Sequence, residues 1–240
     1  MTTCEQYILD YAASGNIFGA EDIIGSWQRT EISRQSLNAM LARLVKLGKL
    51  QRVSRGRYAA DPRKAFKPGL LQSTVDLYKS IEGHYPYASV CIYEGRWLFQ
   101  FMHHLASNNS IYVEVERDAA ESVFEWLRTK GVEAYYRPDG EFIYRYVDLG
   151  KGAVIVKVLT SQSPLHEDNG VKIPALEKIL VDMYCDKDFM YLQGSEYYHV
   201  VNAAQNEYEL NMPTLLRYAS RRNVKDKIKK ILEEAKNDID

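Results

Sequence analysis

The sequence predicts an α+β protein built from two domains of opposite charge. Residues 1–70 hold 11 Lys and Arg against 6 Asp and Glu, while residues 71–240 hold 20 against 26. A chain of 240 residues is long enough for two domains, because single domains commonly have about 100–200 residues. Helical spacing dominates the N-terminal region, whereas strand-like alternation and further helices share the rest. We therefore expect a small basic domain followed by a larger, slightly acidic one.

Three short helices are predicted in the basic region. Thr3 can form a capping box with Gln6, and the apolar residues that follow keep helical spacing until Gly15. A second helix is expected over residues 20–27, with acids in its first turn. Ser33 can cap a third helix. Its buried stripe is formed by Leu37, Met40, Leu41 and Leu44.

A β-hairpin is predicted over residues 50–60, with Arg55-Gly56 as its two-residue loop. In that register Val53 pairs with Tyr58 on the inner face of the hairpin. Three short helices followed by a basic hairpin give the element order of a winged helix-turn-helix, whose third helix enters the major groove of DNA. Residues 1–60 are therefore predicted to form such a domain.

The predicted partner of this domain is double-stranded DNA. Arg34, Gln35 and Asn38, near the start of the third helix, have side chains that can form bidentate hydrogen bonds with purine edges. Further basic residues can neutralise phosphates and so fix the register without reading sequence. They are Arg43, Lys46, Arg52, Arg55 and Arg57. Two other interpretations stay open, because a basic hairpin is often only a solvated edge and many winged helices bind protein.

Residues 61–69 are predicted to be a linker, because they contain two prolines and a glycine but no apolar periodicity. Residues 70–240 are predicted to form a mixed α/β domain with a central, mostly antiparallel sheet and a helical C-terminal end from Pro174 onward. The predicted helices before that end lie over residues 70–82, 96–105 and 118–131. The predicted strands lie over residues 88–93, 111–116, 132–137, 141–147 and 153–159, with Pro138-Asp139-Gly140 as a hairpin turn.

Two segments of the second domain resemble a known family. They are GVKIPALEKILVDMYCD, from Gly170 to Asp186, and PTLLRYASRRNVKDKIKKIL, from Pro213 to Leu232. Together with the winged-helix order, they resemble the AbiEi-type antitoxins of abortive-infection (type IV) toxin-antitoxin systems, whereas residues 84–110 carry no matching motif. The resemblance implies a transcriptional regulator that represses its own operator. It also implies a non-catalytic C-terminal domain that counters a cognate toxin protein.

Glu114 and Glu116 suggest an alternative, a phosphoryl-transfer or nuclease-like enzyme that the winged helix would target to DNA. Residues two apart on a strand share one face, as paired metal-binding carboxylates do in such enzymes. A third acid and a phosphate-binding Gly-Ser turn are both missing, so we favour an exposed strand face with alternating acids and expect no enzyme activity. The adjacent His103 and His104 point about 100° apart on a helix and cannot chelate one ion together. His166-Glu167-Asp168, in a predicted polar loop, is a candidate site for a cation.

The sequence predicts no cofactor and no metal ion, because it contains no P-loop, dinucleotide fingerprint or HExxH motif. The three cysteines, Cys4, Cys91 and Cys185, are far apart and are expected to be reduced. We expect no membrane association, because no apolar run approaches the roughly 20 residues of a membrane span. The N-terminal residues lack the pattern of a secretion signal, which predicts a cytoplasmic protein.

Overall fold

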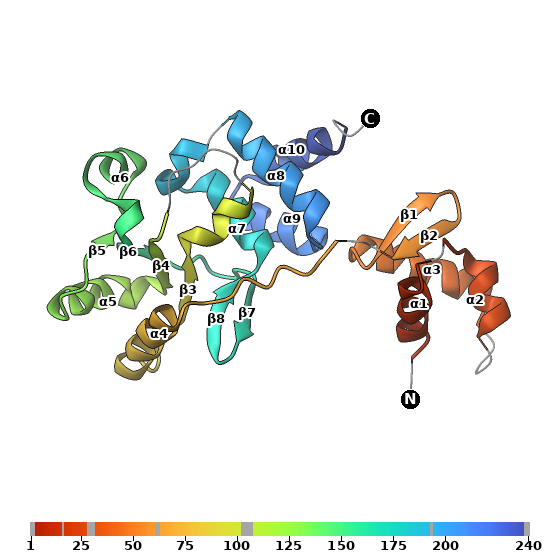
Figure 1. The fold of residues 1–240 in the computed structure, drawn as a ribbon, viewed down its shortest axis with the longest axis horizontal. Coiled ribbons are helices and arrows are strands. Elements are labelled where there is room, and N and C mark those ends of the chain that lie inside the picture. Colours follow the sequence, from red (N-terminus) through yellow and green to blue (C-terminus); the bar gives the residue numbers. More distant parts are fainter. Residues whose placement is uncertain are drawn as a thin grey trace. The chain divides into compact units, whose positions relative to one another are not determined.

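The computed structural model describes residues 3–15, 17–27, 32–60, 63–101, 108–192 and 194–237. Within these ranges helices and strands are mixed along the chain, and the strands form three separate sheets (Figure 1). The predicted α+β class is therefore confirmed. The chain divides into two compact units, the first comprising residues 1–65 and 205–214 and the second residues 66–204 and 215–240.

The first unit contains the three helices and the hairpin expected from the sequence. Its elements are α1 (Cys4–Ala13), α2 (Ala20–Ser26), α3 (Arg34–Lys46), β1 (Leu50–Ser54) and β2 (Arg57–Ala60). Thr3 caps α1 and Ser33 caps α3, each by accepting a hydrogen bond from the backbone N–H three residues on. The core is apolar and formed by all of these elements. Its fully buried side chains include Ile8, Phe18, Ile23, Leu37, Leu41, Leu44 and Leu50.

The register of the hairpin differs from the prediction. A β-bulge between Arg52 and Ser54 places Tyr58 opposite Arg52, and Val53 remains 49% exposed. The predicted pairing of Val53 with Tyr58 is therefore wrong. Tyr58 instead forms two backbone hydrogen bonds with Phe18, at 2.8 and 2.7 Å, which add a one-residue third strand to the hairpin.

Residues 205–214 pack in the first unit, although they lie within the predicted C-terminal domain. The backbone of Lys64 exchanges two 3.0 Å hydrogen bonds with Glu207 and Glu209. Gly48, which has a φ of 73°, lets the chain at the end of α3 lie close to the backbone of Leu210. A Cβ at this position would stand 3.3 Å from the carbonyl oxygen of Leu210. The division of the chain after Ala65 falls inside the predicted linker, residues 61–69.

The second unit is built around a four-stranded sheet of order β3-β4-β6-β5. Its elements up to residue 158 are α4 (Gln72–His84), β3 (Val90–Glu94), the 3-10 helix η1 (Gly95–Phe101), β4 (Ile111–Val115), α5 (Arg117–Thr129), β5 (Ala134–Tyr136), α6 (Gly140–Tyr146), η2 (Leu149–Lys151) and β6 (Val154–Val158). Only β3 and β4 are antiparallel, whereas β6 is parallel to both β4 and β5. The predicted mostly antiparallel sheet is therefore wrong.

The error has a local cause at residues 138–147, which were predicted as a turn and a strand. Asp139 caps a helix instead, because its carboxylate accepts a 2.8 Å hydrogen bond from the N–H of Phe142. Helix α6 then connects β5 to β6 as a crossover, which makes these strands parallel rather than a hairpin. The aromatic residues of this segment are typical of strands, and the single capping residue outweighs that propensity.

The remainder of the chain is a hairpin followed by helices. The elements are β7 (Leu165–Asp168), β8 (Val171–Pro174), α7 (Leu176–Cys185), η3 (Lys187–Leu192), α8 (Ser195–Glu207), α9 (Met212–Arg221) and α10 (Lys225–Asn237). The predicted helical end is confirmed, but residues 166–168 lie in β7 and not in a loop. Of the helix predicted over residues 96–105, the structure has η1, while residues 102–107, with His103 and His104, lie outside the described residues.

Different elements pack against the two edges of the four-stranded sheet. Helix α5 covers β4, β5 and β6, while the β7–β8 hairpin and α4 lie against β3 (Figure 1). All three cysteines are free thiols. In the described part of the chain no helix is both long and apolar enough to cross a membrane.

Candidate functional site

The side chains predicted to contact DNA all lie on the surface of the first unit. Helix α3 buries Leu37, Leu41 and Leu44 and turns its polar and basic residues outward. The hairpin likewise exposes its arginines. The exposed set is Arg34, Gln35, Asn38, Arg43, Lys46, Arg52, Arg55 and Arg57.

Three of these side chains form ion pairs with the first two helices. Arg34 pairs with Glu21 at 2.9 Å, Arg57 with Asp22 at 3.1 Å, and Arg43 with Glu5. Each pair is at least partly exposed, so it contributes about 0–1 kcal/mol and a phosphate can compete for the arginine. The basic residues left without an ion pair within the described ranges are Lys46, Arg52 and Arg55, which we call the basic triplet.

The hairpin turn is held against the start of α2. A Cβ at Gly19 would stand only 2.9 Å from the carbonyl oxygen of Gly56, so a side chain at this position would displace the turn. Asp22 accepts a 2.7 Å hydrogen bond from the N–H of Gly19 and also binds Arg57. These contacts give the hairpin a defined position beside α2, and none of them was predicted from the sequence.

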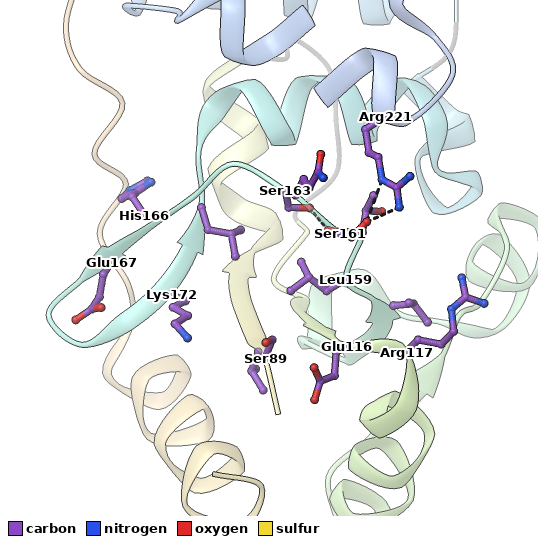
Figure 2. Close-up of a pocket in the computed structure, with 15 residues that line it drawn as sticks. Ser89, Glu116, Arg117, Leu159, Ser161, Ser163, His166, Glu167, Lys172 and Arg221 are labelled. Atoms are coloured by element: carbon purple, nitrogen blue, oxygen red, sulfur yellow. Dashed lines mark hydrogen bonds between the residues drawn. The ribbon is translucent and has the colours of Figure 1, made fainter. Parts of the chain in front are cut away.

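The second unit has an open cleft of about 850 Å³ where β4 and β6 end. Figure 2 shows Glu116 and Arg117 on one side, Lys172, His166 and Glu167 on the β7–β8 hairpin opposite, and the segment after β6 between them. Arg221, from the end of α9, donates a 2.9 Å hydrogen bond from Nε to the hydroxyl of Ser161. The cleft therefore combines charged groups with hydroxyls.

A buried ion-pair cluster lies on the same sheet. It comprises Glu114, Lys157, Lys178, Asp182, Asp186, Asp188 and Arg222. Nζ of Lys178, whose side chain is 1% exposed, lies 2.6 Å from a carboxylate oxygen of Glu114 and also contacts Asp182. Lys157 forms ion pairs with Asp186 and Asp188, and Arg222 forms ion pairs with Asp182 and Asp186. Tyr218 donates a 2.8 Å hydrogen bond to Asp182. The cluster thus connects β4 and β6 to α7, η3 and the end of α9.

Burial and charge act in opposite directions on the pKa values of this cluster. Burial raises the pKa of Glu114 even though Lys178 stands against its carboxylate. Burial also acts to raise the pKa of Asp186, but Lys157 and Arg222 outweigh it and lower that pKa to about 2. For Asp188, which faces the negative Asp186, burial outweighs Lys157 and the pKa is raised.

Asp186 should therefore make stability depend on pH. Its folded-state pKa of about 2 lies below the ordinary value, so its stabilising effect is present above about pH 4 and is lost as pH falls toward 2. The shift corresponds to about 2 kcal/mol. We expect Asp186→Asn to lower the free energy of unfolding by this amount at pH 6, and the difference to shrink below about pH 4 in urea titrations. The exposed Asp76→Asn serves as the control, and a difference that persists at low pH would contradict the assignment.

Glu114 and Glu116 do not form the acidic pair that the alternative enzyme hypothesis requires. Glu114 is buried and bound to Lys178, while Glu116 lies beyond the end of β4 as the N-cap residue of α5 and lines the cleft. The prediction of an exposed strand face is also wrong for Glu114, because β4 is a central strand covered on both faces. Within the described ranges no three His, Cys, Asp or Glu side chains converge in a way that could hold a metal ion.

Neither the cleft nor the ion-pair cluster of the second unit was predicted from the sequence. The ion-pair cluster joins residues that lie far apart in the chain, such as Glu114 and Lys178. One signal was available, because Lys178 and Asp182 stand four apart in α7 with only apolar residues between them, and buried charges need partners. The cleft depends on which strands are neighbours, and that order follows only from the crossover through α6.

Comparison with protein families assigns the chain to one family. Residues 36–238 match the model of a family of unknown function, DUF6577, and the chain belongs to this family. The match includes α3 from its third residue, the hairpin and nearly the whole second unit. No curated protein was found to match the chain.

Proposed function

We propose that this DUF6577 family member is a DNA-binding transcriptional regulator whose first unit acts as a winged helix-turn-helix. The observation that carries the proposal is that α3 and the β1–β2 hairpin, which contact each other through β1, both expose polar and basic side chains. Helix α3 supplies Gln35 and Asn38, whose amides suit adenine edges, and both elements supply cations for phosphates. The core side chains of α3 lie on its opposite face, so DNA contacts leave the fold intact.

The arrangement of the strands supports the same proposal. The bridge between Phe18 and Tyr58 adds the segment between α1 and α2 to the hairpin, and this ties the hairpin to the helical core. Asp22 and Gly19 then fix the turn beside α2. A basic hairpin held rigidly next to a recognition helix can contact the backbone flanking the major groove.

The antitoxin role is the second part of the proposal and rests on the resemblance to AbiEi-type antitoxins. In this role the protein represses its own operator, and the second unit binds a cognate toxin protein without catalysing a reaction. Coexpression with the product of a neighbouring toxin gene is expected to relieve growth arrest. Metal-dependent turnover of nucleotides or DNA that Glu116→Gln abolishes would contradict the non-catalytic role.

DNA recognition can be measured with the full chain and duplexes from upstream of its own gene. Specific binding by such modules exceeds binding to random duplexes by about a thousandfold or more. We expect at least this preference in fluorescence anisotropy titrations at fixed salt. Equal affinity for both duplexes would contradict a role as a regulator of its own operator.

Asn38 is expected to contribute to sequence recognition. Asn38→Ala removes an exposed amide without touching the buried leucines of α3, so it should leave stability unchanged. The expected loss is about 1–3 kcal/mol on the operator and little on random DNA. Gln72→Ala, which removes an exposed amide from α4, is the control. Equal losses on both duplexes would show that Asn38 contacts only the DNA backbone.

A further inference from the structure

The cleft of the second unit lies where two neighbouring parallel strands send the chain in opposite directions. After β4 the chain enters α5, which leads to β5 on the far side of β6. After β6 it runs to the β7–β8 hairpin, which packs beside β3 at the opposite edge. Such a divergence opens a crevice outside the carboxyl ends of the two strands, and ligands of open α/β sheets bind there. The volume of about 850 Å³ suits a ligand of nucleotide size.

The charges that line the cleft are unpaired, in contrast to those of the ion-pair cluster. In the cluster every cation is bound to carboxylates and buried or nearly so. In the cleft Arg117, Lys172 and Arg221 are exposed, and none forms an ion pair with a described residue. Glu116 and Glu167 line the same cleft without pairing with these cations. The cleft thus presents separate donors and acceptors.

Ser161 holds the guanidinium group of Arg221 at the edge of the cleft. Its Nε and Nη2 atoms both donate to the Ser161 hydroxyl, so Nη1 keeps its hydrogen-bond donors for another group. Arg117 extends from the first turn of α5 on the same side of the cleft (Figure 2). Two guanidinium groups on one side of a cleft suit the planar, bidentate recognition of phosphate oxygens.

The acceptors of the cleft suit a sugar. Glu116 is the N-cap residue of α5, yet its carboxylate forms no capping hydrogen bond and is left to accept from a ligand. The hydroxyls of Ser89 and Thr160 line the same cleft. A carboxylate beside a phosphate-binding crevice is the usual partner of ribose hydroxyls.

We propose that this cleft binds a phosphorylated sugar, the ribose phosphate of a nucleotide being the chemical class that fits. Arg117 and Arg221 contact the phosphate and Glu116 contacts the sugar hydroxyls. The site lies wholly within the second unit and does not depend on DNA binding by the first.

Isothermal titration calorimetry of the full chain tests this site with ribose 5-phosphate, ribose, inorganic phosphate and ADP. Ribose 5-phosphate and ADP are expected to bind more tightly than ribose or phosphate alone. Arg117→Gln and Arg221→Gln should each weaken their binding about tenfold or more, because hydrogen bonds to charged groups contribute about 1.5–3 kcal/mol. Both side chains are exposed, so neither change should alter the melting temperature.

Arg217→Gln is the matched control, since Arg217 is exposed one turn earlier on α9 and does not line the cleft. Glu116→Gln is expected to weaken the binding of ribose 5-phosphate but leave the binding of inorganic phosphate unchanged. No binding of either phosphorylated probe at about 10 mM would overturn the proposal. The proposal would also fail if the two arginine variants bound ribose 5-phosphate and ADP as tightly as the wild type does. It would fail as well if inorganic phosphate bound as tightly as ribose 5-phosphate.

Discussion

Replacing Lys178 with methionine should lower the free energy of unfolding of the second unit by about 3–5 kcal/mol. The ammonium group is buried between Glu114 and Asp182, and methionine keeps most of the apolar volume while removing the charge. Asp182 retains Arg222 and Tyr218, but Glu114 is left without its bound cation. An uncompensated buried carboxylate is among the most destabilising changes that a single substitution can cause.

Urea titrations followed by intrinsic fluorescence measure this effect, because the second unit contains the buried Trp97. Without Lys178 the pKa of Glu114 should rise further, so the carboxyl group takes up a proton more readily in the folded state. The deficit of the variant should therefore shrink as pH falls from about 8 to about 5. Lys79→Met, at an exposed position on α4, is the control and should change stability little.

A double variant tests whether the loss of stability comes from the unpaired carboxylate of Glu114. Glu114→Gln combined with Lys178→Met removes both charges, and it should be more stable than Lys178→Met alone because no buried carboxylate is left unpaired at that position. A loss below about 1 kcal/mol for Lys178→Met would mean that water or another cation reaches Glu114. In that case the cluster would not be the rigid link between β4 and α7 that its burial indicates.

Local signals account for most of the first unit. Thr3 and Ser33 mark helix starts, and the spacing of Leu37, Leu41 and Leu44 places the buried face of α3 correctly. The Arg55-Gly56 turn follows from the need for a positive φ, which Gly56 adopts at 74°. Each of these features depends on residues a few positions apart, which a single sequence displays directly.

Features that depend on distant partners were not predictable in this way. The bridge from Phe18 to Tyr58 leaves no periodic trace, because it joins one residue to a strand far along the chain. The bulge at Val53 inserts one extra residue into a hairpin whose alternating pattern predicts regular pairing. Glu114 looked exposed because its strand alternates charged and apolar residues. The partner that makes its burial possible, Lys178, lies 64 residues away.

The segment around α6 shows how one local signal can mislead. Pro138-Asp139-Gly140 serves equally as a hairpin turn or as a helix start, and the aromatic residues after it favour a strand. The choice of a helix changes the direction of β6 and hence the order of the whole sheet. The cleft between the exits of β4 and β6 exists only in that topology, so the same ambiguity concealed the candidate ligand site.

Replacing the basic triplet with alanine should produce the largest loss of DNA affinity. Lys46, Arg52 and Arg55 are exposed and have no acidic partner among the described residues, so nothing must be broken before they bind phosphates. Three phosphate contacts contribute about −2.7 to the slope of log affinity against log salt concentration. Between about 50 and about 200 mM salt, this share alone amounts to roughly a fortyfold change in affinity.

The triple variant is expected to bind operator and random duplexes more weakly by similar factors, because phosphate contacts carry no sequence information. The slope should become flatter by up to about 2.7. Anisotropy titrations at several salt concentrations measure both quantities. The change should leave the fold intact, since all three side chains point into solvent and the core of the unit is formed by other residues.

A matched variant of the second unit decides whether the effect belongs to the surface of α3 and the hairpin or only to net charge. Arg217, Lys225 and Lys227 are exposed and unpaired among the described residues, and replacing them with alanine removes the same total charge. Screening at about 0.15 M salt limits charge effects to about 8 Å, so this variant should retain nearly full affinity if the first unit alone contacts DNA. A loss equal to that of the basic triplet would assign the DNA contacts to α9 and α10. An unchanged salt slope in the triplet variant would remove α3 and the hairpin from the interface.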